Sequence, residues 1–231
     1  MPDNFRFEQE GPLATITFSR PERRNCMTRE VLLDFEKLIH RVRDGSGVRV
    51  LIVTGEGTAF SAGADTSAGK GVSDPHERIK IFGEHNKGSA RIVGRVCDTV
   101  LRLDTLTIGA VNGYAVGGGW ALASAMDFVV AAETAEFWLP EVELAAPFSG
   151  VPAEIIARRV GPWRAKEIMI LCRHYLARDL LGMGMVNQVV NPAELMSAAH
   201  ELAQALLKMP RGAATATKHA IDNVAIGPRL Y

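Results

Sequence analysis

Residues 110–119 read Ala-Val-Asn-Gly-Tyr-Ala-Val-Gly-Gly-Gly, and this stretch governs how the rest of the chain is interpreted. An apolar run from Thr107 to Val111 predicts a strand that enters it, and a short helix is predicted from Trp120 onward. Glycines permit close backbone approach, and the first N–H groups of a helix favour a negatively charged oxygen. Taken alone, this turn fits an anion site and tight strand-to-helix packing equally well.

A second turn of small residues follows an earlier apolar strand. Residues 48–54 predict a largely buried strand, and the turn from Gly55 to Asp65 follows it. A dinucleotide-binding loop is a weak interpretation, because Phe60 stands where the third glycine of that fingerprint belongs and no helix follows directly. The Gly-Lys-Ser/Thr of a phosphate-binding loop is absent as well. Two such turns together predict that each aims one N–H group at a single oxygen.

The rest of the chain predicts alternating strands and helices in one domain. The predicted elements are a β-hairpin over 5–18, a helix over 28–43 with Thr28 as its N-cap, a mobile loop to about Pro75, a helix over 77–103 broken near Gly88, strands at Phe128–Ala131, near Phe137 and at Val186–Val190, and helices over most of the remainder. This order indicates an α/β fold with a loosely repeated ββα layout. The helical end after about residue 190 could sit apart from the main body.

Composition narrows the classes of partner. The 231 residues include 26 Lys plus Arg and 26 Asp plus Glu, so the formal net charge is zero, which argues against nucleic acid as a main partner. The three cysteines are widely spaced and match no metal-ligand pattern, so we expect a reducing compartment and no metal site. No apolar run approaches the ~20 residues of a membrane span, and the first residues do not resemble a signal peptide. We therefore expect a cytoplasmic protein that does not bind membranes.

Five segments together resemble the crotonase family, also called the enoyl-CoA hydratase/isomerase superfamily. The segments are Arg20 to Asn25, Phe60-Ser61-Ala62-Gly63-Ala64-Asp65, the stretch at 110–119, Leu139-Pro140-Glu141, and Met185 to Val190. In the same order they resemble the family's early CoA-contacting turn, its F-x-A-G-A-D segment, its A-V-N-G-x-A-x-G-G-G segment, its P-E motif and its later G-L-V-x-x-V-V. Each segment alone is a weak signal, but five in this order and spacing are specific.

The resemblance implies an α/β fold built as a crotonase-like spiral of ββα units over residues 1–190. Residues 191–231 would form a helical C-terminal segment of the same domain, shorter than is usual for the family. The implied substrate is an acyl-CoA thioester, so CoA arrives as part of the substrate and no separate cofactor is expected. The implied assembly is a homo-oligomer, either a trimer or a hexamer.

The resemblance also implies an oxyanion hole made by the backbone N–H groups of Ala64 and Gly118, which would hold the thioester carbonyl. Losing one such donor typically costs ~3 kcal/mol in the barrier. The residues implied to contact the substrate or CoA are Arg23, Arg24, Ser61, Ala62, Gly63, Asp65, Gly117 and Trp120. From residue type alone, Asp65 is better suited to holding its own turn, and Trp120 to packing, with a place in the acyl pocket left open for Trp120.

The acid and base groups depart from the family's hydratases, which use two glutamates. The first of those positions holds Ala121 here, and the second holds Glu141. Hydration needs a base for the water and an acid for the α-carbon, whereas moving a proton along an allylic system needs one group that takes it and returns it. We therefore predict an enolate-stabilising enoyl-CoA isomerase with Glu141 as its single acid/base. Glu143 is a minor candidate for the same role.

Three alternatives stay open at this point. They are a hydratase in which another residue or water replaces the missing glutamate, a crotonase that works on C–C bonds or decarboxylates, and a non-catalytic CoA-binding homologue. For proton exchange near neutrality Glu141 needs a raised pKa, which apolar neighbours such as Phe137 and Leu139 could supply by desolvation. Without the resemblance, a turn cap or an arginine pair would be the simpler role for Glu141.

Overall fold

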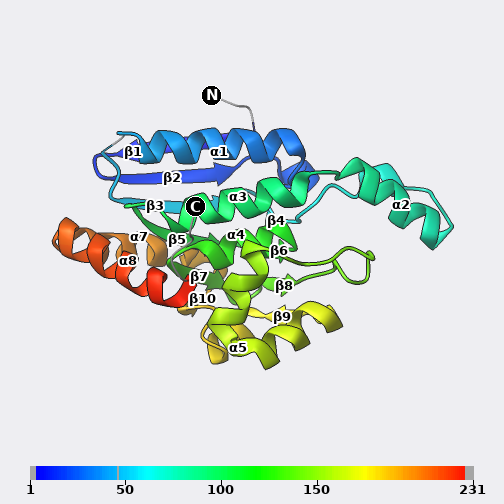
Figure 1. Cartoon of the computed structure of the whole chain (residues 1–231). Coiled ribbons are helices and arrows are strands. Elements are labelled where there is room, and N and C mark those ends of the chain that lie inside the picture. Colours follow the sequence, from blue (N-terminus) through cyan, green and yellow to red (C-terminus); the bar gives the residue numbers. More distant parts are fainter. Residues whose placement is uncertain (1–3, 46, 227–231) are drawn as a thin grey trace.

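The computed structural model describes residues 4–45 and 47–226, and Figure 1 shows two sheets with helices packed around them. The larger sheet has the strand order β1-β2-β3-β5-β7-β10. Its strands are β1 Phe5–Glu10, β2 Leu13–Phe18, β3 Val50–Gly55, β5 Leu106–Val111, β7 Phe128–Ala132 and β10 Gln188–Val190. β1 and β2 pair antiparallel and the other neighbours pair parallel. The predicted hairpin and the α/β class are confirmed.

The smaller sheet has the order β4-β6-β8-β9. Its strands are β4 Ala59–Ser61, β6 Tyr114–Val116, β8 Glu136–Trp138 and β9 Tyr175–Leu176. The pairs β3-β4, β5-β6 and β7-β8 each place one strand in each sheet before a helix, so the chain winds through the predicted ββα units. The sequence pattern does not predict β4 and β6, because strands of three residues beside glycines carry almost no alternation.

The helix α1, Arg29–Arg43, covers the hairpin and β3 (Figure 1). It begins as predicted, because the Thr28 hydroxyl accepts a hydrogen bond from the N–H of Val31 at 3.3 Å. Its apolar residues recur at helical spacing and are buried, which fixes the face that packs on the sheet.

The long helix predicted over 77–103 is two helices, α2 Pro75–His85 and α3 Ser89–Leu101. The predicted break is confirmed at Gly88, whose φ of +86° is one that glycine adopts without strain. None of the residues of α2 is buried, and Figure 1 shows it extending away from the body. α3 instead packs between α1 and α4.

The helix α4, Gly118–Ala125, begins two residues before the predicted start at Trp120. The later helices are α5 Val151–Leu171, α6 Ala177–Gly182, α7 Leu195–Leu207 and α8 Arg211–Ile226, and short 3-10 turns occur at Pro21–Arg23, Ser67–Gly69 and Pro192–Glu194. α7 does not sit apart from the body: Leu195, Ala199 and Ala203 are buried in the same cluster as residues of β3 and β5.

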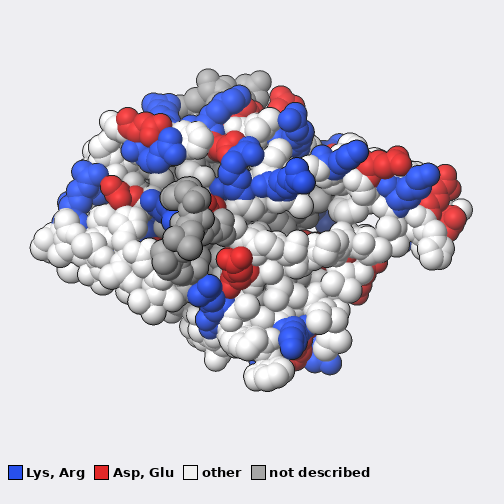
Figure 2. Space-filling model, viewed as in Figure 1, with Lys and Arg blue, Asp and Glu red and all other residues white. Residues whose placement is uncertain are grey.

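Surface charge is mixed on the face shown in Figure 2. Lys and Arg are interspersed with Asp and Glu over α1, α3 and α2, while the surface over α8 shows few charges. Within residues 4–45 and 47–226, no helix combines the length and the apolar character of a membrane crossing.

Candidate active site

The smaller sheet brings the two glycine-containing turns together. β4 pairs parallel with β6, so the turns that follow them, residues 62–65 and 117–119, leave the same edge of the sheet. A Cβ atom built on Gly63 would lie 2.5 Å from the carbonyl oxygen of Val116 and 3.6 Å from the nitrogen of Gly118. Any side chain at Gly63 would therefore push the turns apart, and glycine is required for their contact.

Two backbone N–H groups at this meeting point are free to bind a ligand. Among the described residues, the N–H groups of Ala64 and Gly118 donate to no protein acceptor, whereas those of the neighbouring Gly63 and Gly117 do. Ala64 and Gly118 are each only partly buried. Gly118 is the first residue of α4, where unpaired N–H groups and the helix dipole favour negative charge. The pair has donors of the kind an oxyanion hole needs, and the role that the resemblance implies for them stays a prediction.

The carboxyl of Glu141 lies beside the same turn. The N–H of Gly117 donates to the carbonyl oxygen of Trp138 at 3.0 Å, which holds the chain that leads to Glu141 against the start of α4. A Cβ atom on Gly117 would lie only 2.6 Å from Oε1 of Glu141. Glycine at this position therefore leaves the space that the carboxyl fills, beside the residue that precedes Gly118.

The surroundings of Glu141 suit proton exchange. Its Oε2 atom is buried and has no hydrogen-bond partner among the described residues. Burial raises the pKa of Glu141 to about 7, although a hydrogen bond from the backbone opposes that shift. The expected raised pKa is confirmed, and no arginine pair explains this side chain. A carboxyl with a pKa near neutrality can take up and release a proton.

No second carboxyl was found at the position that family hydratases use. Ala121 is completely buried in α4, where its N–H donates to the carbonyl oxygen of Gly117 at 2.9 Å. Glu143, the minor candidate, is exposed in the turn after Glu141. The burial that tunes Glu141 therefore does not extend to Glu143, and the structure favours Glu141 as the reactive carboxyl.

Arg23 and Asp65, both predicted to contact substrate, bind each other. The Arg23 guanidinium donates to both carboxyl oxygens of Asp65, at 3.1 and 3.0 Å, and the N–H of Ser67 donates to Asp65 at 2.9 Å. Burial by itself would raise the pKa of Asp65, but these hydrogen bonds and the Arg23 charge lower it. Asp65 thus ties the turn at residues 21–24 to the turn at residues 62–65, and holding its own turn is the role favoured from its residue type.

Ser61 is also engaged within the protein. It is completely buried, and its hydroxyl donates to the carbonyl oxygen of Asn25 at 2.8 Å and accepts from the N–H of Gly63 at 3.2 Å. Ala62 remains partly exposed beside it. The Arg24 guanidinium lies 5.8 Å from the ring centre of Tyr114, and contact of Arg24 and Ala62 with CoA stays a prediction.

Trp120 lies in the core. It is 2% exposed and packs its ring against Phe137 and Tyr175, with ring centres 5.8 and 6.1 Å away. Its position does not support the acyl-pocket role left open above. The reason is geometric: Trp120 is two residues after Gly118 in α4, so its side chain leaves the helix on a different face.

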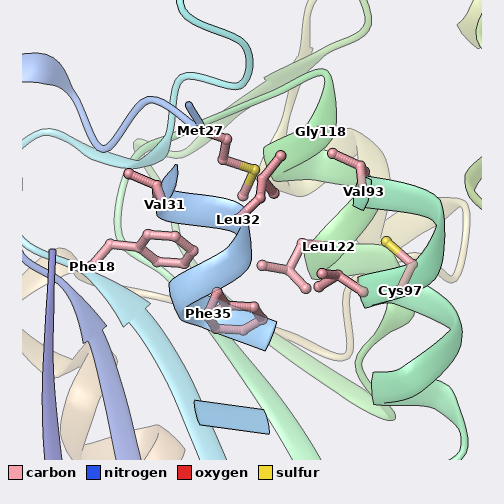
Figure 3. A pocket seen from close by; sticks show the side chains of 10 residues that line it. Phe18, Met27, Val31, Leu32, Phe35, Val93, Cys97, Gly118 and Leu122 are labelled. Atoms are coloured by element: carbon pink, nitrogen blue, oxygen red, sulfur yellow. The ribbon is translucent and has the colours of Figure 1, made fainter. Parts of the chain in front are cut away.

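An apolar hollow lies beside Gly118 (Figure 3). The sequence interpretation did not predict the residues that line it. Its volume is about 10 Å³, room for about one water molecule. The lining residues are Phe18, Met27, Val31, Leu32, Phe35, Val93, Val96, Cys97, Gly118 and Leu122. The available signal was the helical period of α1 and α3, which predicts buried faces but not that these faces meet at Gly118.

Comparison with known proteins agrees with this fold. The family model described as enoyl-CoA hydratase/isomerase matches residues 8–227. The short-chain-enoyl-CoA hydratase of Clostridium acetobutylicum is 32% identical over 225 residues, covering 95% of this chain and 81% of the relative.

Solved structures show the same architecture. A putative enoyl-CoA hydratase/isomerase family protein from Hyphomonas neptunium superposes with a TM-score of 0.86 at 26% identity, covering 98% of this chain and 84% of the other. A monofunctional enoyl CoA isomerase from M. smegmatis superposes with a TM-score of 0.80 at 27% identity, covering 99% of this chain and 96% of the other. The chain belongs to the enoyl-CoA hydratase/isomerase family of the crotonase superfamily. It is an enzyme of that family.

Proposed function

We propose that this enzyme is an enoyl-CoA isomerase, which moves the double bond of a β,γ-enoyl-CoA thioester into the α,β position. The observation that carries the proposal is one shielded carboxyl with a raised pKa beside the glycine turn. Glu141 lies against Gly117 with a pKa of about 7, and the position of a second glutamate holds the buried Ala121. One carboxyl suffices for proton transfer between two carbons of the same substrate.

The reaction follows from these groups. The thioester carbonyl accepts hydrogen bonds from the N–H groups of Ala64 and Gly118. The Glu141 carboxylate removes a proton from the α-carbon, and the electron pair of that C–H bond becomes part of a dienolate whose negative oxygen the two amides stabilise. The protonated Glu141 then returns the proton to the γ-carbon, which leaves the double bond between the α- and β-carbons. Nothing is gained or lost overall, so no co-reactant is needed.

Relatives support the proposal and also supply a second candidate. The isomerase from M. smegmatis superposes over nearly its whole length. The Clostridium acetobutylicum relative and the crotonyl-CoA hydratase of Syntrophomonas wolfei are named as hydratases, each 32% identical to this chain. Hydration of an α,β-enoyl-CoA is therefore the second candidate, and it would require an ordered water or another acid in place of the missing glutamate.

One experiment separates the two candidates. Purified protein is incubated in deuterated water with a β,γ-enoyl-CoA in one sample and an α,β-enoyl-CoA in another, and the products are examined by mass spectrometry and NMR. Isomerisation moves the double bond in the first sample without adding water. If the second sample gains the mass of one heavy water molecule, hydration is the reaction and the single-carboxyl argument is wrong. No change in either sample would reject both candidates.

The matched pair of variants is Glu141→Gln and Glu143→Gln. Both replace one carboxyl by an isosteric amide in the same turn, but only Glu141 lies against Gly117, and Glu143 is exposed. Turnover should collapse in the first variant and persist in the second. Equal losses would show that the turn, rather than the Glu141 carboxyl, is what activity requires.

A further inference from the structure

Met27 contacts both halves of the oxyanion hole. Its N–H donates to the carbonyl oxygen of Gly63 at 2.7 Å, and its backbone forms a parallel bridge with Ala64. A Cβ atom built on Gly118 would lie 3.4 Å from the Met27 sulfur. The Met27 backbone therefore holds one amide turn while its side chain rests against the other.

Val93 of α3 lies against the same point. A Cβ atom built on Gly118 would lie 3.4 Å from one of its methyl carbons and 3.7 Å from the other. Figure 3 shows Met27 and Val93 on either side of Gly118, with Leu122 and Cys97 below them in this view. Met27, Val93 and Gly118 all line the apolar hollow between α1, α3 and α4, so the two side chains fill the space next to Gly118.

The hollow is apolar and nearly filled. Its walls are aliphatic and aromatic apart from the Cys97 thiol, and burial raises the pKa of that thiol to about 12, so it carries no charge. A volume of about 10 Å³ holds about one water molecule, far less than a chain of several methylenes needs. A long acyl chain can enter only if Met27 or Val93 makes room.

The segment that follows the oxyanion turn, from Thr66 through α2, offers no apolar cover comparable to the hollow. The residues from Thr66 to Asp74 whose exposure is described are all exposed or half-buried, and α2 contributes no buried residue. Methylenes that extend in that direction stay largely in water and add little binding energy.

We propose that Met27 and Val93 are specificity-determining residues that restrict this enzyme to short acyl-CoA substrates, with a butenoyl group preferred to an octenoyl group. This inference rests on the proposed function and names its substrate class. Shortening either side chain opens the hollow to a longer straight acyl chain. Since each methylene that fits or fails to fit an apolar pocket changes discrimination by roughly tenfold or more, the shift should be large.

The test compares wild type with Val93→Ala and Met27→Ala. For each protein, kcat/KM is measured for β,γ-butenoyl-CoA and β,γ-octenoyl-CoA, and the dissociation constants of the unreactive butyryl-CoA and octanoyl-CoA are measured by calorimetry. We expect wild type to favour the short chain, and the octenoyl-to-butenoyl ratio to rise roughly tenfold in Val93→Ala. The ratio is the readout, because a general loss of stability lowers both rates together.

Val100→Ala is the matched control. Val100 is a completely buried valine of the same helix that does not line the hollow, so its truncation has a similar effect on packing without opening it. Its chain-length ratio should equal that of wild type. Val93→Leu, which narrows the hollow, should lower the ratio.

The outcomes separate this inference from the proposed function. Wild type that prefers octenoyl-CoA, or a ratio that moves equally in Val93→Ala and Val100→Ala, overturns the inference and leaves isomerisation intact. Absence of turnover with every substrate rejects the proposed function, yet a shifted ratio of octanoyl-CoA to butyryl-CoA binding would still support the role of Met27 and Val93. Unchanged binding ratios would reject that role as well.

Discussion

The two ends of α4 each hold a buried carboxyl, and the two carboxyls differ in their partners. At the C-terminal end, Asp127 accepts hydrogen bonds from the Lys218 ammonium at 2.8 Å, the Thr107 N–H at 2.7 Å and the Thr107 hydroxyl at 2.9 Å. At the N-terminal end, the buried Oε2 of Glu141 has no partner among the described residues. Both carboxyls are shielded from water, but Asp127 accepts hydrogen bonds from other segments, whereas the one that acts on Glu141 comes from its own backbone.

The difference separates a structural carboxyl from a reactive one. A carboxylate that is paired and hydrogen-bonded fixes its neighbours, and here Asp127 anchors α8 to the larger sheet through Lys218. A buried carboxyl without a charged partner keeps its proton to higher pH, because desolvation disfavours the charged form. Perturbed carboxyls of this kind concentrate at active sites. The predictions below test whether the two ends differ in this way.

The largest effect is expected for turnover in Glu141→Gln. The amide keeps the shape of the side chain but cannot carry the proton between carbons, so we expect kcat to fall by about 10²–10⁴-fold. Steady-state kinetics on β,γ-enoyl-CoA measures the loss. Asp127→Asn, at the other end of α4, is the contrasting variant. It leaves Glu141 unchanged, so the folded variant should keep its turnover. A tenfold or smaller loss in Glu141→Gln would remove Glu141 from the mechanism.

The next effect concerns the stability of the other end. Asp127→Asn leaves the Lys218 ammonium, which is 6% exposed, without its countercharge, so we expect the free energy of unfolding to fall by roughly 3 kcal/mol. Urea titration measures this change. Adding Lys218→Met in the same chain should recover part of the loss, because the unpaired charge is then removed. If the single and double variants are equally unstable, the ion pair is not what anchors α8.

A smaller and opposite effect is expected for stability in Glu141→Gln. The folded protein holds the Glu141 proton up to a pKa of about 7, whereas the unfolded chain releases it near the ordinary glutamate pKa of 4.5. Wild type therefore loses stability as pH rises between these two values, by roughly 2–3 kcal/mol in total. The free energy of unfolding of the variant should therefore rise relative to wild type between pH 4.5 and 7, and the difference should stay constant at higher pH. Denaturant midpoints at pH 4.5 and 8 measure the change, and a pH-independent difference would contradict it.

The smallest effect is the pH dependence of turnover. Removal of the α-proton needs the carboxylate, so kcat/KM should fall as pH drops through about 7 and approach roughly tenfold loss per pH unit below it. Rates for β,γ-enoyl-CoA between pH 5 and 9 measure the profile, with circular dichroism at each pH to confirm folding. A flat profile down to pH 5 would mean that Glu141 titrates as an ordinary exposed carboxyl.

Most secondary structure followed from local pattern. The α1 helix, its Thr28 cap and the break at Gly88 were predicted because each depends on residues within a few positions of one another. The short strands β4 and β6 were missed, since three residues cannot show alternation and the two strands that pair are more than fifty residues apart in the chain. The start of α4 was placed late, because glycine is a poor helix former and Gly118 and Gly119 form its first turn.

The candidate site divides in the same way. The sequence shows the residue types of the two glycine turns and has Ala121 where a second glutamate would stand. These features pointed to the family and to a single carboxyl. The sequence did not show the roles of individual side chains. Ser61 and Asp65 hydrogen-bond within the protein, and Trp120 packs in the core, because side-chain direction depends on the strand or helix that carries each residue.

The sequence by itself therefore determined the ββα order, the two amide-bearing turns and the presence of one candidate acid/base, all of which are written in residue type and spacing. Only the tertiary structure shows that Glu141 lies against Gly117 with no hydrogen bond to its Oε2 from the described residues. Only it shows that Met27 and Val93 line the hollow beside Gly118, and that Lys218 pairs with Asp127. The physical reason is that pKa, cavity size and ion pairing depend on distances between segments far apart in the chain, and packing sets those distances.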